Sequence, residues 1–76
     1  DMEPMIVHVS PQTNADELVT HSGQEFNYVL SGVVKVVIGN REFILSEGDS
    51  IYFNPIAPHG QRAVGGDATF LTVINE

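Results

Sequence analysis

Hydrophobic and polar positions alternate along this chain in short runs, and each run ends at a turn-forming residue. Residues 25–30 show the pattern most clearly, because three apolar side chains fall on one face of an extended strand and Glu25, Asn27 and Val29 fall on the other. Such runs recur at the spacing of roughly 8–12 residues that is typical of an all-β sandwich or barrel. The pattern therefore predicts an all-β domain without helices.

The runs predict about eight strands bounded by Gly, Pro, Asn and Ser. The predicted ranges are 5–9, 18–21, 25–30, 33–38, 41–45, 50–53, 59–64 and 68–74, and residues 10–16 form a polar loop. Gly39-Asn40 is suited to a two-residue hairpin turn and separates two of these strands. The last two ranges are expected to pair with each other across residues 65–67.

The length allows a single domain over residues 1–76, without internal repeats or linkers. In so small a core, burial barely offsets an ordering entropy of roughly 1.5 kcal/mol per residue, so small domains commonly need a disulfide, a metal or a partner. The absence of cysteine removes disulfides, thiol nucleophiles and zinc fingers. The remaining sources of stability are a metal ion, a second copy of the chain or a longer parent protein. The start at Asp1-Met2 fits a boundary within a longer chain.

The net charge limits the classes of partner that this chain can bind. Three Lys and Arg stand against ten Asp and Glu, which gives a net charge of −7 and opposes binding to a polyanion. The apolar runs are far too short to span a membrane, and no secretory signal opens the sequence. We expect a cytoplasmic protein that does not bind nucleic acid by itself or enter a membrane.

Three residues suggest metal chemistry. His21, Glu25 and His59 supply two imidazoles and one carboxylate, the ligand set of a facial triad that holds a divalent ion such as Fe(II). In one straight strand, His21 and Glu25 would lie about 13 Å apart. A turn over residues 22–24 would make His21 end one strand and Glu25 begin its antiparallel neighbour, on the same face. His59 opens a strand after Pro58, so all three side chains are expected at one end of a barrel.

Two simpler interpretations stay open. A histidine in so short a chain is usually a surface or core residue, and a barrel without any ligand would carry the same alternation. His8 lies in the middle of a predicted strand without a neighbouring carboxylate. We interpret His8 as structural.

Two segments of the chain resemble the motifs of the cupin superfamily. Residues 21–32 (HSGQEFNYVLSG) match the first motif in the spacing of His21, Glu25 and Gly32, and residues 48–59 (GDSIYFNPIAPH) match the second in the spacing of Gly48 and His59. The length between the motifs is similar to that of microbial cupins. The resemblance implies a double-stranded β-helix, the cupin jelly-roll barrel, with its site inside.

The chain also departs from the cupin pattern. Cupins usually have a further His at the position of Val19, so the resemblance transfers only the triad of His21, Glu25 and His59. The other departures are Thr13, Asn54, Ile56 and Ala63. The implied cofactor is one divalent ion, Fe, Zn, Mn or Ni.

Two kinds of cupin look most similar. One is the ligand-sensing C-terminal domain of bacterial helix-turn-helix transcriptional regulators, and the other is hydroxypropylphosphonate epoxidase, a non-haem iron enzyme with the same His, Glu, His set. Both imply that this chain is the C-terminal part of a longer protein. In a parent regulator, the N-terminal domain would bind DNA.

We favour a sensor domain that binds a small molecule or a metal inside the barrel. The alternative is a non-haem metal-dependent oxygenase or epoxidase that uses the triad. By parity with Glu25 and His59, Asn27 and Gln61 point inward and are the expected ligand-binding pair. Exposed sheet edges also predict a homodimer formed by sheet extension and apolar faces, built on residues 5–9.

Overall fold

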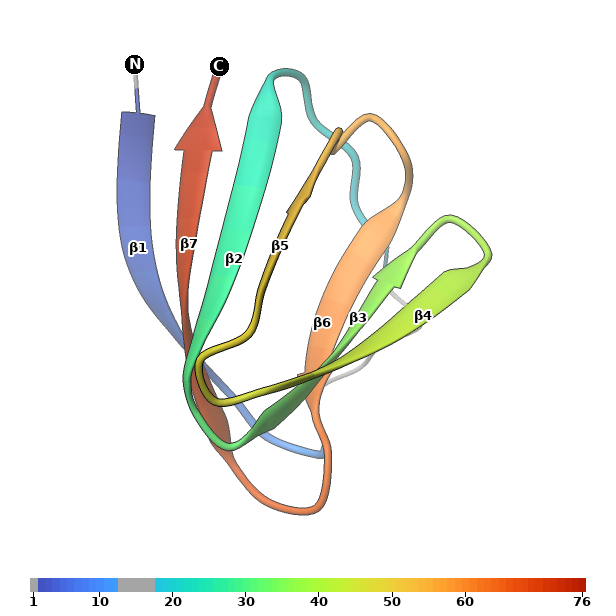
Figure 1. Cartoon of the computed structure of the whole chain (residues 1–76). Helices are drawn as coiled ribbons and strands as arrows, with labels where there is room; N and C mark the ends of the chain where they lie inside the picture. Colours follow the sequence, from blue (N-terminus) through green and yellow to red (C-terminus); the bar gives the residue numbers. More distant parts are fainter. Residues whose placement is uncertain (1, 13–17) are drawn as a thin grey trace.

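The computed structural model describes residues 2–12 and 18–76, and it contains seven β-strands (Figure 1). No helix within the described part of the chain is long and apolar enough to cross a bilayer. The strands are β1 (Met2–Val9), β2 (Gln24–Ser31), β3 (Val33–Ile38), β4 (Arg41–Ser46), β5 (Ser50–Phe53), β6 (His59–Ala63) and β7 (Ala68–Asn75).

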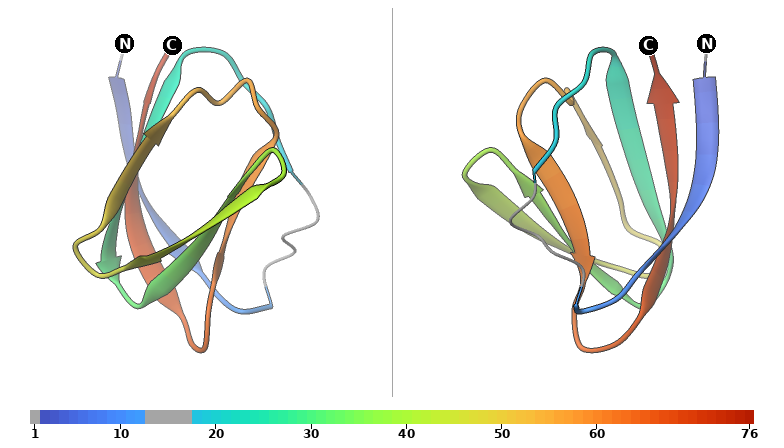
Figure 2. Two further views of the ribbon diagram at one scale, coloured as in Figure 1. Left: turned by 45° about the vertical axis from the view of Figure 1, so that its right-hand side comes forward. Right: turned by 180° about the vertical axis from the view of Figure 1, so that it is seen from behind.

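The strands form two antiparallel sheets that face each other. One sheet has the order β1-β7-β2-β5 and the other the order β4-β3-β6. Figures 1 and 2 show the sheets as the two sides of an open barrel. The all-β double-stranded β-helix predicted from the sequence is therefore confirmed.

Most of the predicted strands are present, and the Gly39-Asn40 hairpin is confirmed. Ile38 pairs with Arg41 across the turn, so the loop contains two residues. Gly39 has φ +61°, while every positive φ in the described residues belongs to a glycine. A positive φ at the first central position only is the geometry of a type II′ turn, which favours glycine there.

Two predictions about strand pairing are wrong. Residues 18–21 do not form a strand, because only Val19 makes a single bridge, to His59. β6 and β7 do not pair with each other either: β6 pairs with β3, and β7 pairs with β1 and β2. The chain crosses from one sheet to the other between β6 and β7. Ala63 of β6 and Phe70 of β7 therefore face each other across the core between the two sheets.

The interior of the barrel has an apolar half that joins the sheets. Its core contains six buried side chains from both sheets, Val29, Val34, Val36, Ala63, Ala68 and Phe70. Thr13 and most of the predicted loop over residues 10–16 lie outside the described residues.

Candidate metal centre

The other half of the interior is polar. Along β2 the inward side chains change from Val29 to Asn27 and Glu25, and along β6 they change from Ala63 to His59. Both strands begin at the end of the barrel where the two chain termini lie (Figure 1). Gln24, the first residue of β2, pairs with Asn75, the last residue of β7. We call this part of the interior the polar end; it consists of Glu25, Asn27, His59, Gln61 and Thr72.

His21 reaches the polar end from the segment before β2. Its backbone N–H donates to the carbonyl of Pro55, 3.1 Å away, so the segment is fastened to the β5–β6 connection. Gly23 then turns the chain into β2 with φ +95°, and a Cβ on Gly23 would collide with the backbone oxygen of Asn75. The sequence correctly placed a turn here, but the segment carrying His21 does not pair with β2 as predicted. It lies beside β6 instead and bridges to His59 through Val19.

The three predicted ligands come together around one oxygen. Nε2 of His21 lies 2.9 Å from Oε1 of Glu25, and Nε2 of His59 lies 3.1 Å from the same oxygen. The two imidazole rings are 5.1 Å apart between centroids and nearly perpendicular. The side chains of His59 and Glu25 are 2% and 5% exposed, whereas that of His21 is 23% exposed and forms the open side of the site.

Backbone carbonyls determine which imidazole nitrogen carries a proton. Nδ1 of His21 lies 3.0 Å from the carbonyl of Ser22, and Nδ1 of His59 lies 2.9 Å from the carbonyl of Ala57. A carbonyl only accepts, so each Nδ1–H donates and each neutral ring keeps its lone pair on Nε2. Two nitrogen lone pairs and a carboxylate oxygen therefore converge, and this arrangement requires a proton or a metal cation between them.

The distance from Oε1 of Glu25 to Nε2 of each histidine fits a shared divalent ion. Ligand atoms at right angles around an ion with bonds of about 2.1 Å are about 3.0 Å apart, which is the separation of Glu25 Oε1 from each Nε2. All the candidate ligand atoms lie within 4.8 Å of one another. Two imidazoles and one carboxylate suit Fe, Mn, Ni or Zn.

The second oxygen of Glu25 is held by three donors. Oε2 accepts hydrogen bonds from Asn27 Nδ2 at 3.0 Å and from Gln61 Nε2 at 3.0 Å, with Thr72 Oγ1 at 3.4 Å. Asn27 also bonds Thr72 and Gln61. This network directs Oε1 alone toward the histidines, so Glu25 is arranged to bind through one oxygen.

Asn27 and Gln61 point inward as predicted, and their described hydrogen bonds go to this network. Their role in binding a small molecule remains a prediction. Sequence reasoning missed Thr72. The alternation of β7 places Thr72 on the same face as buried Phe70. Thr69 is also a threonine of this strand but lies on the opposite face, so residue type alone could not identify Thr72 as part of the site.

The environment of His21 changes its basicity. Burial lowers the pKa of His21, but its hydrogen bond to the Ser22 carbonyl and the nearby carboxylates of Glu25 and Glu76 have the larger combined effect. The net result is a pKa raised above 6.5. No Lys or Arg in the described residues forms an ion pair with Glu25; Oε1 of Glu25 contacts the two histidines.

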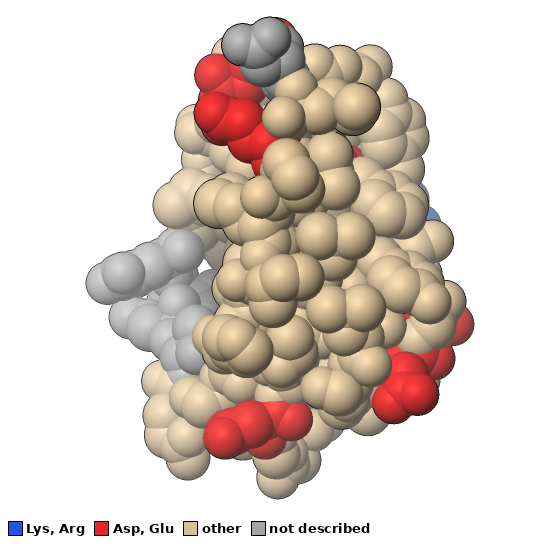
Figure 3. All heavy atoms as spheres, turned by 90° about the vertical axis from the view of Figure 1, so that its left-hand side faces the viewer, with Lys and Arg blue, Asp and Glu red and all other residues tan. Residues whose placement is uncertain are grey.

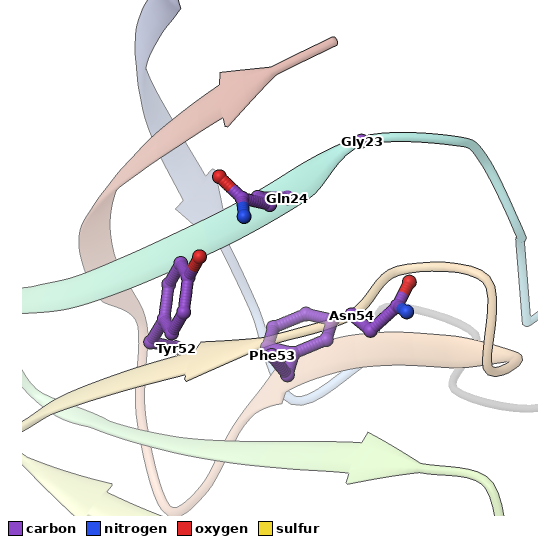
Figure 4. Close-up of a pocket in the computed structure, with 5 residues that line it drawn as sticks. All are labelled: Gly23, Gln24, Tyr52, Phe53 and Asn54. Atoms are coloured by element: carbon purple, nitrogen blue, oxygen red, sulfur yellow. The ribbon is translucent and has the colours of Figure 1, made fainter.

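A surface hollow borders the site. Its volume is about 360 Å³, and it is lined by Gly23, Gln24, Tyr52, Phe53 and Asn54, where β2 begins and β5 ends (Figure 4). The ring of Phe53 packs edge-on against His59 with centroids 5.0 Å apart. Phe53 thus lies between this hollow and the buried side chain of His59.

Several solved structures are similar to this chain. Hydroxypropylphosphonic acid epoxidase from S. wedmorenis is 28% identical with a TM-score of 0.83, over 97% of this chain and 43% of that protein. The Fe(II) form of HppE in complex with substrate is 30% identical with a TM-score of 0.83, over 97% of this chain and 45% of that one. An HTH_3 family transcriptional regulator from Vibrio cholerae is 23% identical with a TM-score of 0.87, over 99% of this chain and 43% of that one. At this identity the similarity is one of fold alone.

The chain therefore spans less than half the length of these proteins. No curated protein is significantly similar to it. The family model for the cupin domain matches residues 5–74, which is nearly the whole chain. This match agrees with the jelly-roll barrel and with the resemblance carried by the two motifs, and the chain belongs to the cupin domain family.

Proposed function

We propose that His21, Glu25 and His59 bind one divalent metal ion. The observation that carries this proposal is the convergence of Nε2 of His21 and Nε2 of His59 on Oε1 of Glu25, at 2.9 and 3.1 Å. Three electron-pair donors converge in a largely buried site, and they need a metal cation or a proton between them. Fe, Zn, Mn and Ni are the candidates.

We further propose that the site serves sensing rather than catalysis. An enzyme of this type needs polar groups aimed at its substrate. Here the amides of Asn27 and Gln61 and the hydroxyl of Thr72 are all directed to Glu25, and Arg62 alternates with Gln61 and faces outward. In this proposal a small molecule enters beside His21, which forms the open side of the site.

The proposed biological context is a cytoplasmic bacterial transcriptional regulator. The chain would be its sensor domain, and a separate N-terminal domain would bind DNA, because a net charge of −7 opposes DNA binding by this part. A homodimer would provide two arrangements whose balance a ligand shifts. The likeness to a longer helix-turn-helix regulator in fold supports this context.

A metal-dependent enzyme is the second candidate. The supporting observation is that the epoxidase structures reach 28–30% identity over 97% of this chain, and one of them is described as an Fe(II) form with substrate. A divalent ion held by three ligands would supply Lewis-acid or redox chemistry at its open positions.

Metal titration tests the shared part of both candidates. We expect the purified chain to bind one equivalent of Co²⁺ or Fe²⁺ under anaerobic conditions, and His21→Ala to abolish this binding. His8→Ala is the matched control, since His8 is exposed and bonds Thr69 on another part of the barrel. Unchanged binding by His21→Ala would show that other residues hold the ion.

Oxygen uptake separates the two candidates. Protein loaded with Fe²⁺ that consumes oxygen in multiple turnovers with an organic substrate would contradict the sensor. A tightly retained organic ligand without oxygen uptake would contradict the enzyme. We expect the second result.

A further inference from the structure

The side-chain hydrogen-bond donors of the polar end are used within the protein. Nδ2 of Asn27 donates to Glu25 and to Thr72, and Nε2 of Gln61 donates to Glu25 and to Asn27. The hydroxyl of Thr72 donates to Oε2 of Glu25. An amide nitrogen carries two protons and a hydroxyl carries one, so these three side chains have no donor left for a ligand.

The two imidazole rings add no free donor. Nδ1 of His21 donates to the carbonyl of Ser22, and Nδ1 of His59 donates to the carbonyl of Ala57. Each Nε2 faces Oε1 of Glu25, at the position proposed for the metal. A molecule that enters beside His21 therefore meets no free donor among the side chains of the polar end and its two histidines.

Acceptors, in contrast, remain. Oε1 of Gln61 makes no hydrogen bond within the described part of the chain. In that part no buried side-chain oxygen or nitrogen lacks a partner, so this oxygen is accessible. The amide of Gln61 cannot be turned around, because its nitrogen must face Oε2 of Glu25, which only accepts. Oδ1 of Asn27 accepts one hydrogen bond and has a second lone pair.

The carboxylate of Glu76 adds negative charge on the open side. The backbone of Glu76 lies beside Gly23, since a Cβ on Gly23 would be 2.9 Å from the Cα of Glu76. Burial has the largest single effect on the pKa of His21 and lowers it, but the charges that act on this pKa are the carboxylates of Glu25 and Glu76, and both raise it. The open side of the site is therefore electrostatically negative before a metal binds.

Glu3 is a second carboxylate at this end. Glu3 and Glu25 both pair with Ile74, so they lie on the same, inner side of the sheet. Figure 3 shows acidic atoms at the top of its view, the end at which the two termini lie in Figure 1. We call Glu3 and Glu76 the rim carboxylates.

The basic residues do not neutralise the rim carboxylates. Lys35 alternates with two buried valines and pairs with Arg62 on the outer side of the other sheet. The guanidinium of Arg41 lies over the ring of Phe43, 5.1 Å from its centroid. These three are all the Lys and Arg of the chain, and within the described residues none of them forms an ion pair with a rim carboxylate.

We propose that the small molecule taken up beside the metal presents a protonated amino group to the polar end and the rim carboxylates. An ammonium group donates three hydrogen bonds and carries the charge that carboxylates attract. A carboxylate or phosphate in the same place would meet acceptors and like charge without a donor, and sites reject a polar group that stays unpaired. The inference rests on the proposed metal site. The ion and Glu25 together keep one positive charge, so an anionic group is expected only on the ion itself.

Three hydroxamates test the proposal with the Co²⁺-loaded protein. β-Alanine hydroxamate, butyrohydroxamate and succinic acid monohydroxamate bind a metal through the same group, and they end in an ammonium, a methyl and a carboxylate group. The visible absorption of Co²⁺ measures each dissociation constant, and free Co²⁺ provides the reference for each ligand. Relative to free Co²⁺, we expect the ammonium ligand to bind at least about tenfold more tightly than the carboxylate ligand, with the methyl ligand between them.

Two variants test whether the rim contributes to this preference. Glu76→Gln removes one rim charge and should reduce the ratio of the two dissociation constants by about threefold or more. Glu42→Gln is the matched control, because Glu42 is an exposed carboxylate that lies 3.7 Å from Lys35 on the other sheet, and it should leave the ratio unchanged. Far-UV circular dichroism checks that both variants are folded.

The outcomes separate this inference from the metal site on which it rests. Protein that binds Co²⁺ but binds the ammonium and carboxylate ligands equally, prefers the carboxylate ligand, or binds none of the three would overturn the inference alone. Protein that binds no Co²⁺ would overturn the metal site and the inference together. Equal effects of Glu76→Gln and Glu42→Gln on the ratio would overturn the role of Glu76.

Discussion

Gln61 donates a hydrogen bond from Nε2 to Oε2 of Glu25 over 3.0 Å, although the two residues are 36 positions apart and belong to opposite sheets. This contact joins the sheets at the polar end and leaves Oε1 of Glu25 for the histidines. Gln61 thereby helps to fix the orientation of the proposed metal ligand.

Replacing Gln61 with leucine should weaken metal binding. The substitution removes one of the donors to Oε2 and leaves a buried carboxylate oxygen less well held, and loss of such a supporting contact typically costs about 10- to 100-fold in metal affinity. Titration with Co²⁺ measures the change. Gln24→Leu is the control, because Gln24 is exposed at the start of β2 and bonds only Asn75 among the described contacts. Equal affinities for the two variants would contradict an orienting role for Gln61.

The two histidines should differ in their effect on stability. His59 is 2% exposed and packs against Phe53, so His59→Ala leaves a cavity and should lower the free energy of unfolding by about 2 kcal/mol or more. His21→Ala removes a partly exposed ring and should change stability much less. Urea unfolding of the metal-free variants checks this order. A larger loss for His21→Ala would mean that the buried position of His59 does not contribute as described.

Acid should weaken metal binding, beginning at a higher pH than for an ordinary histidine. Protonation of His21 competes with the metal for Nε2, and its pKa is raised above 6.5 because the Ser22 carbonyl and nearby carboxylates outweigh burial. Metal affinity should therefore begin to fall as pH decreases toward this raised pKa. Metal titrations at a series of pH values across neutrality measure this fall in affinity. His8→Gln is the control and should show the same pH dependence of metal binding as the wild type.

The metal-free protein should show the opposite pH trend in stability. A pKa that is raised on folding contributes stability that is fully present below the unfolded value of about 6.5 and is lost as pH rises through the folded value. Urea unfolding in the presence of chelator should show this contribution in the wild type and a flatter profile in His21→Gln. Identical profiles would contradict a raised pKa at His21.

Gly23 should be more sensitive to substitution than Gly48. Both have a positive φ, +95° and +87°, but a Cβ on Gly23 would meet the backbone of Asn75 whereas one on Gly48 meets nothing within 4 Å. Gly48→Ala should cost about 1 kcal/mol from its backbone conformation alone. Gly23→Ala should cost more and also weaken metal binding, because His21 would shift. Equal losses of stability would show that the contact with Asn75 can relax freely.

Local patterns in the sequence predicted most of the strands. The alternation in residues 25–30 identified β2 and put Glu25 and Asn27 on one face, and Gly39-Asn40 identified a hairpin, because these features depend on neighbouring residues only. The pairing of β6 with β3 depends on contacts between distant segments. Nothing in the short connection over residues 65–67 distinguishes a hairpin from a crossing between sheets.

The candidate site was predicted in part for the same reason. His21, Glu25 and His59 are recognisable by residue type and spacing, and they do converge. The path of residues 18–21 along β6 and the β5–β6 connection was not predictable, since it depends on backbone contacts with Pro55 and His59. Thr72 contributes through a hydroxyl from the last strand, and only the folded chain shows which threonine faces Glu25.

The central claim is that His21, Glu25 and His59 bind one divalent ion through three atoms. A crystal structure of the Co²⁺-loaded protein, with anomalous diffraction at the cobalt edge, tests it most directly. The account predicts one ion bound by Nε2 of both histidines and by Oε1 of Glu25, with Oε2 still accepting from Asn27 and Gln61. An ion bound elsewhere, or bound by both oxygens of Glu25, would contradict it.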